Sequence, residues 1–447
     1  MQWQVALNND SFDRAGITKD CKDAVCEYIW NSFEAGASKV SVSMTGNPLQ
    51  EAMALVVADN GTGIAFDNLD KTFGTFLASL KNDATMRLKS QSNKGKGRFS
   101  YLSFSHSAEW RTVYYTDEKL MQYTISTNSA DRSQFNTTEP VIAVDTTETG
   151  TIATFPLDDS DIVGLLSFGA MKQKLLEEFA WYLFLNKDKG FVLEYTGVPL
   201  DISEYIRTDL SRNCSCKIGE HDFSIDVVVW NSSVSNSSKI YYRTEKGEIA
   251  AIRNTSFNKN TVNFYHAVFV SSKYFVANMF IPSEDDGGQT EMEAFSLTEQ
   301  RSVFCVLNKQ IRVLVAEVLK AFLVQQADAH LSKMERKGNF PRFADDEYGK
   351  LRKKDFEAVT RELYCVEPKI FHKLNDTQEK SLLGFLNLLL SSEERENVLQ
   401  IIEQVVSLTS EQRKSFANVL KRSQLQYIVE AISIIEKRVS VIEALKK

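Results

Sequence analysis

The sequence contains few of the residues that build disulfide frameworks, metal sites or disordered segments. Its 447 residues include 7 prolines, 6 cysteines and 5 histidines. The cysteines have no C-x-x-C spacing and the histidines do not cluster, so the pattern favours free thiols over a zinc site or a set of disulfides. The cysteines are Cys21, Cys26, Cys214, Cys216, Cys305 and Cys365.

Long apolar runs and an excess of positive charge are also missing. No apolar stretch approaches the ~18–20 residues needed to span a bilayer. The start, MQWQVALNNDSF, lacks the basic and apolar regions of a signal peptide, so we expect a cytoplasmic protein with no membrane partner. The net charge of −7 gives no whole-chain signal for nucleic acid, and small-molecule or protein partners fit it better.

The pattern along the chain predicts three regions, in keeping with ~100–200 residues per domain. We expect an α+β domain over residues 1–160, a connecting helix and a second α/β domain over 161–330, and a helical region over 331–447. Helices are predicted at 20–36, 170–186 and 297–326, and strands at 39–44, 54–59, 108–116, 120–127, 149–157, 223–230, 239–245 and 274–282.

The helix predicted at the start of the first domain carries a carboxylate and an amide one turn apart. Glu27 and Asn31 lie in CEYIWNSFEAGASKVSV, residues 26–42, and a spacing of four places them on one helix face. A carboxylate suits general-base work, and an amide oxygen suits Mg²⁺, which binds alongside substrate phosphates. A solvated helix face is the plainer alternative for this pair.

A strand that ends in an acidic and glycine-rich turn follows. In VVADNGTGI, residues 56–64, Asp59 is succeeded by Gly61 and Gly63. Such a turn places a carboxylate beside backbone that a ligand can approach closely, and Asp59 can accept a hydrogen bond from an exocyclic amine. A simple hairpin turn is the alternative.

Two further segments complete the constellation. Glycines and basic residues alternate in NKGKGRFS, residues 93–100, before a helix-compatible YLSF, and backbone N–H groups there can bind phosphate. The spacing does not match the G-x-x-x-x-G-K-[ST] loop, and a basic flexible loop is equally compatible. GTIATF, residues 150–155, offers the hydroxyl of Thr151 at the start of a strand.

Taken in order, the four segments resemble the N-box, the two glycine boxes and the final Gly-Thr strand of GHKL ATPases. This superfamily includes gyrase B, MutL, the MORC proteins, heat-shock chaperones of the ninety-kilodalton class and histidine kinases. NSFEAGASKV is similar to the MutL and MORC type of N-box, and DNGTGI matches the second box. The resemblance covers residues 12–157 and implies an α/β sandwich that binds ATP and Mg²⁺.

The resemblance also implies roles for individual residues. Glu27 matches the general base, Asn31 the Mg²⁺ ligand and Asp59 the residue that binds the adenine amine. The remaining matches are Gly61 and Gly63 beneath the base, Gly95 and Gly97 at the phosphates, and Thr151 in support of Asp59. Because hydrolysing members carry the glutamate, we expect ATP hydrolysis to ADP and phosphate.

Residues 66–97 correspond to the lid of these ATPases. Ser79 and Lys81 in FGTFLASLKND are placed to approach the phosphates, although a mobile surface loop fits equally. Lys94, Lys96 and Arg98 are all candidates for a phosphate contact, since this box is more basic than in gyrase or the chaperones.

A basic residue from the second domain is a further expectation. SLTEQRSVF resembles the chaperone segment that carries a γ-phosphate-binding arginine, which makes Arg301 the transducer candidate. A surface arginine at a helix start is the alternative.

The leading hypothesis is an ATP-gated dimeric switch, with residues 1–18 as a segment exchanged between protomers. A disordered or simply packed terminus fits residues 1–18 equally well. The C-terminal region resembles the spacer before nuclease domains in bacterial defence-type proteins, which implies a sensor for a DNA-directed or protein effector in antiviral defence. A chaperone-like ATPase that remodels a protein client and a non-hydrolysing ATP-binding interaction module remain alternatives.

Overall fold

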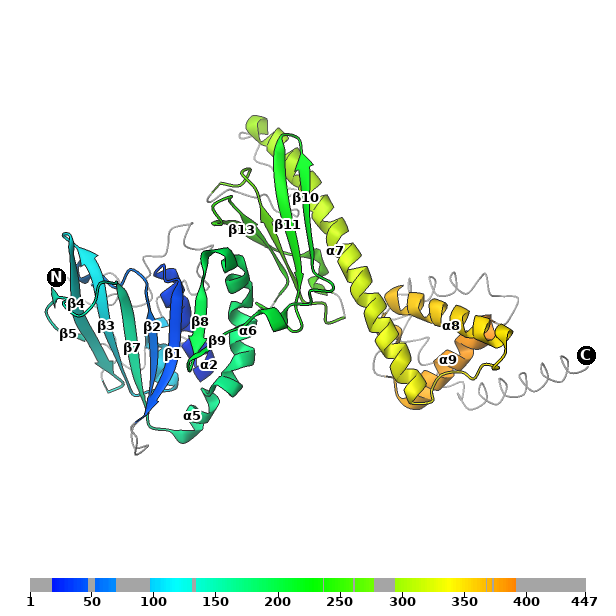
Figure 1. Cartoon of the computed structure of the whole chain (residues 1–447), viewed down its shortest axis with the longest axis horizontal. Helices are drawn as coiled ribbons and strands as arrows, with labels where there is room; N and C mark the ends of the chain where they lie inside the picture. The colour runs from blue at the N-terminus through cyan, green and yellow to red at the C-terminus, as the bar shows by residue number, and fades with distance from the viewer. Residues whose placement is uncertain are drawn as a thin grey trace, which may run out of the picture. The chain divides into compact units, whose positions relative to one another are not determined.

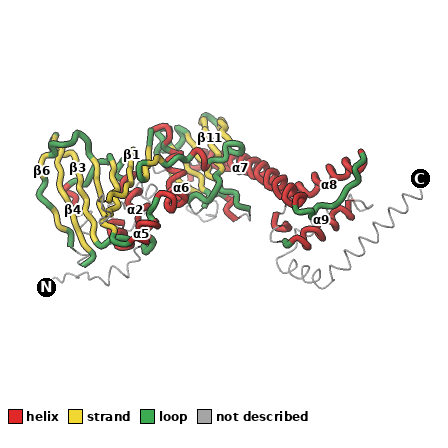
Figure 2. Tube along the Cα trace, turned by 60° about the horizontal axis from the view of Figure 1, so that its bottom comes forward, coloured by secondary structure: helices red, strands yellow, loops and turns green. Residues whose placement is uncertain are grey.

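A computed structural model of the chain describes residues 18–46, 53–69, 97–130, 134–235, 237–259, 262–276, 294–366, 368–371 and 374–390 (Figures 1 and 2). Contacts along the chain divide it into two units. The first is Met1–Asn258 with Tyr265–Ile311, and the second is Lys259–Phe264 with Arg312–Lys447.

The first unit contains a nine-stranded sheet in which all neighbouring strands are antiparallel except β1 and β8. Its order is β5 (Asn136–Thr137), β4 (Lys119–Asn128), β3 (Ser107–Thr116), β7 (Gly150–Leu157), β2 (Met53–Asp59), β1 (Lys39–Gly46), β8 (Val192–Tyr195) and β9 (Val198–Pro199), with β6 (Val141–Ile142) paired to β4. The order of the strands in the sheet therefore differs from their order in the sequence.

One face of this sheet is buried and the other is exposed. In β3 the side chains of Ala108, Trp110 and Tyr114 are buried, whereas those of Glu109 and Tyr115 are exposed. Such alternation is typical of a sheet covered on a single face. The cover consists of α2 (Cys21–Glu34), α5 (Ser160–Leu165) and α6 (Phe168–Leu185). The result is the α/β sandwich predicted from the sequence.

The start of α2 is fixed by its own sequence. The Asp20 carboxylate accepts hydrogen bonds from the backbone N–H groups of Lys22, at 2.8 Å, and Asp23, at 3.1 Å. These bonds satisfy donors that have no partner inside the helix. At the other end Gly36 has a φ of +80°, which a glycine adopts without strain and which turns the chain into β1.

A second, five-stranded sheet belongs to the same unit. Its order is β10 (Arg212–Ile218), β11 (His221–Val229), β14 (His266–Ser271), β12 (Lys239–Arg243) and β13 (Ile249–Asn254). Of its neighbouring strands only β14 and β12 are parallel to each other.

Helix α6 contributes to two hydrophobic layers at once. Phe179 of α6 packs against Trp30 of α2, with ring centroids 4.8 Å apart. Trp181 of the same helix stacks on Tyr241 of β12 at 4.6 Å and 11°. Aromatic contacts of this kind add to the area they bury. The helix therefore joins the first sandwich to the second sheet.

The opposite face of the second sheet is covered by α7 (Ala294–Arg336). Tyr242 of β12 packs against Phe304 with ring centroids 5.4 Å apart, and its hydroxyl donates to Asn308 Oδ1 at 2.8 Å. The second sheet therefore lies between α6 and α7, in agreement with the α/β pattern predicted for this region.

The described residues of the second unit beyond Ile311 are mainly helical, as predicted for the C-terminal region. They include α7 from Arg312 onward, α8 (Glu347–Val366), the short η7 (Pro368–Phe371) and α9 (Asp376–Leu390). Asn339 is buried and donates to Glu379 Oε2 at 2.8 Å, which ties the end of α7 to α9. The described helices include none that is both long and apolar enough to cross a membrane.

Two details differ from the expectations. The helix predicted at 297–326 runs from Ala294 to Arg336. A strand was predicted at 274–282, but the strand of this region, β14, already ends at Ser271; the Ser272 hydroxyl accepts from the Tyr274 backbone N–H at 3.1 Å and turns the chain. Residues 277–282 lie outside the described residues, and the domain boundaries at 160 and 330 stay predictions.

Candidate active site

Glu27 and Asn31 approach a single glycine from one face of α2. A Cβ atom added to Gly97 would lie 3.2 Å from Glu27 Oε2 and 3.3 Å from Asn31 Nδ2. The absent side chain lets both groups approach the Gly97 backbone closely. Glu27 Oε2 is shielded from solvent. A carboxylate, an amide and a glycine backbone predicted from separate segments thus meet in space.

A buried tyrosine that the sequence analysis did not single out joins these segments. The Tyr28 hydroxyl donates to the Arg98 carbonyl at 3.0 Å and accepts from the Tyr101 backbone N–H at 3.0 Å. Burial raises the pKa of Tyr28 well above its usual value, so the hydroxyl keeps its proton. Tyr28 therefore anchors η3 (Gly97–Ser103) to the helix that carries Glu27.

Asp59, the last residue of β2, is held by three donors. Its Oδ1 atom accepts from the backbone N–H groups of Gly61, at 2.9 Å, and Thr151, at 3.3 Å, and its Oδ2 atom accepts from the Ser32 hydroxyl at 3.0 Å. Burial raises the pKa of Asp59, and these hydrogen bonds oppose the rise because they favour the ionised form. The side chain is thus an oriented acceptor. Ser32 is a second residue that the sequence analysis missed.

The two glycines after Asp59 sit where no side chain fits. A Cβ atom on Gly61 would lie 2.8 Å from the Ala35 carbonyl oxygen, and one on Gly63, which has a φ of +72°, would lie 2.1 Å from that of Val113. Both distances are shorter than real Cβ contacts. The glycines are required by the close approach of the chain's own backbone, and the close approach of a ligand that their spacing predicts stays a prediction.

The turn is tied to β3 and β7 by threonine hydroxyls. Thr112 Oγ1 accepts from the Ile64 backbone N–H at 2.9 Å and lies 3.2 Å from Thr151 Oγ1. Thr112 is fully buried and was not identified from the sequence. Only the strand register, which pairs Thr112 with Thr151, brings it to the site.

These elements enclose a cavity of about 120 Å³. Among the predicted site residues Asn31, Asp59, Gly63, Arg98 and Thr151 line it. A pocket for a drug-sized ligand spans ~300–1,000 Å³, so this cavity accommodates only part of a nucleotide. Burial lowers the pKa of Arg98 to about 10, which leaves its guanidinium charged at neutral pH.

Several predicted residues cannot be placed in the site. Ser79, Lys81, Lys94, Gly95 and Lys96 lie outside the described residues, as does most of the predicted lid and all of 1–17. Arg301 belongs to α7, but its side chain is outside the description. The residue that contacts the γ-phosphate therefore stays a prediction.

Residues 19–153 match the model of the family described as histidine kinase-, DNA gyrase B-, and HSP90-like ATPase. This match spans the helix, the two glycine turns and the threonine strand whose geometry is given above. Residues 19–153 form a GHKL ATPase domain. No curated protein matches the chain.

The described residues of the GHKL domain fit a magnesium nucleotide. Asp59 offers an oriented carboxylate to an exocyclic amine, and Asn31 offers an oxygen of the type that Mg²⁺ prefers. Mg²⁺ takes most of its other ligands from water and substrate phosphates, so a single protein oxygen is compatible with such a site. Arg98 adds positive charge to the same cavity.

Proposed function

We propose that the chain binds ATP with Mg²⁺ in the GHKL domain and hydrolyses it to ADP and phosphate. The convergence of Glu27 and Asn31 on Gly97 supports this proposal, because a carboxylate suited to general-base work and an amide suited to Mg²⁺ approach the same stretch of backbone. The family includes members that bind ATP without hydrolysis, so the identity of residue 27 is decisive.

Each residue has a separate task in this proposal. Glu27 orients a water molecule and accepts its proton, and Asn31 holds the metal. Asp59, fixed by Ser32, accepts the adenine amine and selects for it. Arg98, together with the predicted Lys94, Lys96, Ser79, Lys81 and Arg301, stabilises phosphate charge. Bound Mg²⁺ supplies charge neutralisation on the phosphates.

Turnover of wild type and of Glu27→Gln tests the proposal. General-base catalysis contributes roughly 10²–10⁴-fold, so we expect at least a 100-fold lower kcat with ATP binding retained. Asp23→Asn is a matched control, since Asp23 lies on the same helix and pairs with Lys174 outside the cavity. Absence of turnover in the wild type, or full turnover by Glu27→Gln, would contradict the assignment.

We further propose that nucleotide binding drives association of two copies. The support is the family resemblance together with α6, which packs on both α2 and the second sheet and so links the GHKL domain to its neighbour. A ligand shifts such an equilibrium only by its differential affinity for the two states. Mass measurement with a non-hydrolysable ATP analogue should show a dimer, and an unchanged monomer with analogue bound would refute the switch.

The partner of the switch is proposed to be duplex DNA or a protein effector. Stimulation of ATP turnover by duplex DNA, lost at high salt, would support the nucleic-acid-directed role in defence. Stimulation by an unfolded client protein alone would instead favour the chaperone-like alternative.

A further inference from the structure

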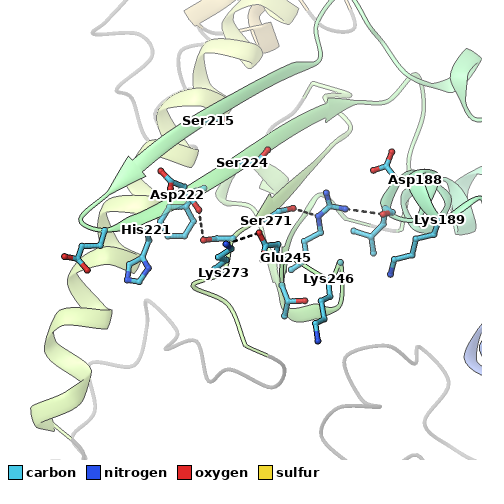
Figure 3. A pocket seen from close by; sticks show the side chains of 17 residues that line it. Asp188, Lys189, Ser215, His221, Asp222, Ser224, Glu245, Lys246, Ser271 and Lys273 are labelled. Carbon is cyan, nitrogen blue, oxygen red and sulfur yellow. Dashed lines mark hydrogen bonds and ion pairs between the residues drawn. The ribbon is translucent and has the colours of Figure 1, made fainter.

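The second sheet has a cavity of about 660 Å³ that the GHKL site does not use (Figure 3). It lies on the face that α6 covers, at the point where α6 ends. Phe184, near this end, packs against Phe269 of β14 with ring centroids 4.9 Å apart. Beyond Leu185 the chain enters η4 (Lys187–Lys189), and the cavity lies over the part of the sheet that follows.

The floor of the cavity is a row of polar side chains that crosses four strands. The register pairs Ser215 of β10 with Ser224 of β11, Ser224 with Ser271 of β14, and Ser271 with Arg243 of β12. Neighbouring strands lie ~4.8 Å apart, so hydroxyls follow one another at this interval. Small side chains leave the space above them open. We call these three serines and the arginine the serine row.

Part of the hydrogen-bonding capacity of the serine row is used and part is open. Arg243 Nε donates to the Ser271 hydroxyl, and Arg243 Nη1 donates to the Leu185 carbonyl at the end of α6, at 3.1 Å. A guanidinium has five N–H donors. Among the described residues no side chain bonds the hydroxyls of Ser215 or Ser224.

Positive charge is concentrated where the cavity meets α6. Lys189 lies beside Gly247 of the β12–β13 turn, where an added Cβ would be 3.4 Å from Lys189 Nζ. Lys246 precedes this glycine, and within the described part of the chain neither lysine forms an ion pair. With Arg243 they make three cations at this end against one acid, Asp188.

The rest of the rim carries the opposite sign or is neutralised. Lys273 and Glu245 pair with each other at 3.5 Å and are mostly exposed. Figure 3 shows His221 and Asp222 at the end of the cavity away from Asp188 and Lys189, and Glu220 also lines the cavity. The cavity therefore runs from a cationic end, over hydroxyls, to an end with two carboxylates.

We propose that this cavity binds a small phosphomonoester with a hydroxylated body, such as a nucleoside monophosphate or a sugar phosphate. The phosphate lies against Arg243, Lys189 and Lys246, since charge-assisted hydrogen bonds to cations are the strong ones. The hydroxyls of the body lie over the serine row, and hydrogen-bond donors of the ligand face Asp222 and Glu220. The volume lies within the range of small-ligand pockets.

The cavity is also connected to α6 through the hydrogen bond between Arg243 and the Leu185 carbonyl. A phosphate bound to the remaining N–H groups of Arg243 would share the guanidinium with the Leu185 carbonyl, which links occupancy of the cavity to the end of the helix that packs on α2. An effect of this ligand on ATP turnover through α6 rests on the proposed ATPase function. Binding of the ligand to the cavity does not depend on that function.

Calorimetric titration of the full chain tests the site. AMP, ribose 5-phosphate, adenosine and inorganic phosphate are the probes, and Asp59→Asn is the background so that the GHKL site does not compete. We expect one phosphomonoester per chain and at least tenfold weaker binding after Lys189→Ala with Lys246→Ala. Ser224→Val should weaken binding as strongly as the double lysine variant, because valine is well tolerated in a strand but replaces the hydroxyl at the floor of the cavity with methyl groups.

Lys187→Ala is the matched control, because Lys187 belongs to η4 but lies over the Phe184 ring at 4.4 Å and does not line the cavity. It should leave binding unchanged. The relative affinities of AMP and ribose 5-phosphate distinguish the two sources of the phosphomonoester. The proposal would be overturned if neither AMP nor ribose 5-phosphate bound, or if the double lysine variant bound them as tightly as the parent protein. It would also be overturned if adenosine bound as tightly as AMP, or inorganic phosphate as tightly as ribose 5-phosphate.

Discussion

Replacement of Tyr28 by phenylalanine removes one oxygen atom from the centre of the GHKL domain. The ring itself stays packed, with its centroid 4.5 Å from that of Phe155. The change deletes the donor to the Arg98 carbonyl and leaves the N–H of Tyr101, a fully buried residue, without its acceptor. The effect is therefore one of hydrogen bonding and not of cavity formation.

The magnitude follows from those two bonds. An ordinary hydrogen bond contributes ~1 kcal/mol net, and an unsatisfied buried group costs ~1–3 kcal/mol. We expect a loss of about 2–3 kcal/mol in the free energy of unfolding, and about 4–12 °C in Tm at ~2–4 °C per kcal/mol for a domain of this size. Because η3 carries Gly97, kcat should also fall if Glu27 acts as proposed.

Denaturant unfolding of Tyr28→Phe and Tyr182→Phe measures this effect against a control. Tyr182 packs in the same aromatic layer, 5.2 Å from Trp30 between ring centroids, and burial raises its pKa to about 12. No described residue forms a hydrogen bond with its hydroxyl, so Tyr182→Phe should change stability by less than about 0.5 kcal/mol. If the two variants unfold alike, the anchoring role of Tyr28 is refuted.

Two further substitutions probe the turn after β2. Gly63→Ala places a methyl group 2.1 Å from the Val113 carbonyl oxygen at a φ of +72°, so it should destabilise the fold by more than about 3 kcal/mol, whereas Gly164→Ala, which meets open space in α5, should be neutral or stabilising in the same unfolding assay. Asp59→Asn should abolish nucleotide binding yet increase the free energy of unfolding at neutral pH. The reason is that burial raises the pKa of Asp59, so the folded state holds its proton more tightly than the unfolded chain and loses stability as pH rises through the folded-state pKa. For the same reason nucleotide binding to wild type, which needs the ionised carboxylate, should weaken as pH falls, and the midpoint of this pH dependence should lie above the usual pKa of aspartate. A free energy of unfolding that is lower for Asp59→Asn than for wild type at pH 7 would contradict the predicted stabilisation.

The sequence was informative wherever the signal was local. Glu27 and Asn31 share one helix, and Asp59, Gly61 and Gly63 share one turn, so spacing alone placed each set together. The helices described between residues 331 and 390 followed in the same way from their apolar periodicity, because helical contacts are short in sequence.

Residues that act across the sequence could not be predicted. Tyr28 binds backbone 70 and 73 residues away, and Ser32 reaches Asp59 over 27 residues. Their roles depend on how η3 and β2 pack on α2, which no spacing rule gives. The serine row depends on the register of four strands, where a shift of one residue would turn each hydroxyl to the other face.

The position of α6 has a practical consequence for dissection of the chain. A fragment that stops near residue 160 would lack both α6 and β8, the strand that lies parallel to β1. It would expose Trp30 and Phe33, which pack against Phe179, and leave β1 as an open sheet edge. The shortest well-folded fragment that contains the GHKL domain should therefore extend through Pro199, the end of β9, and crystallisation or ligand screening of this domain is best begun with that length or more.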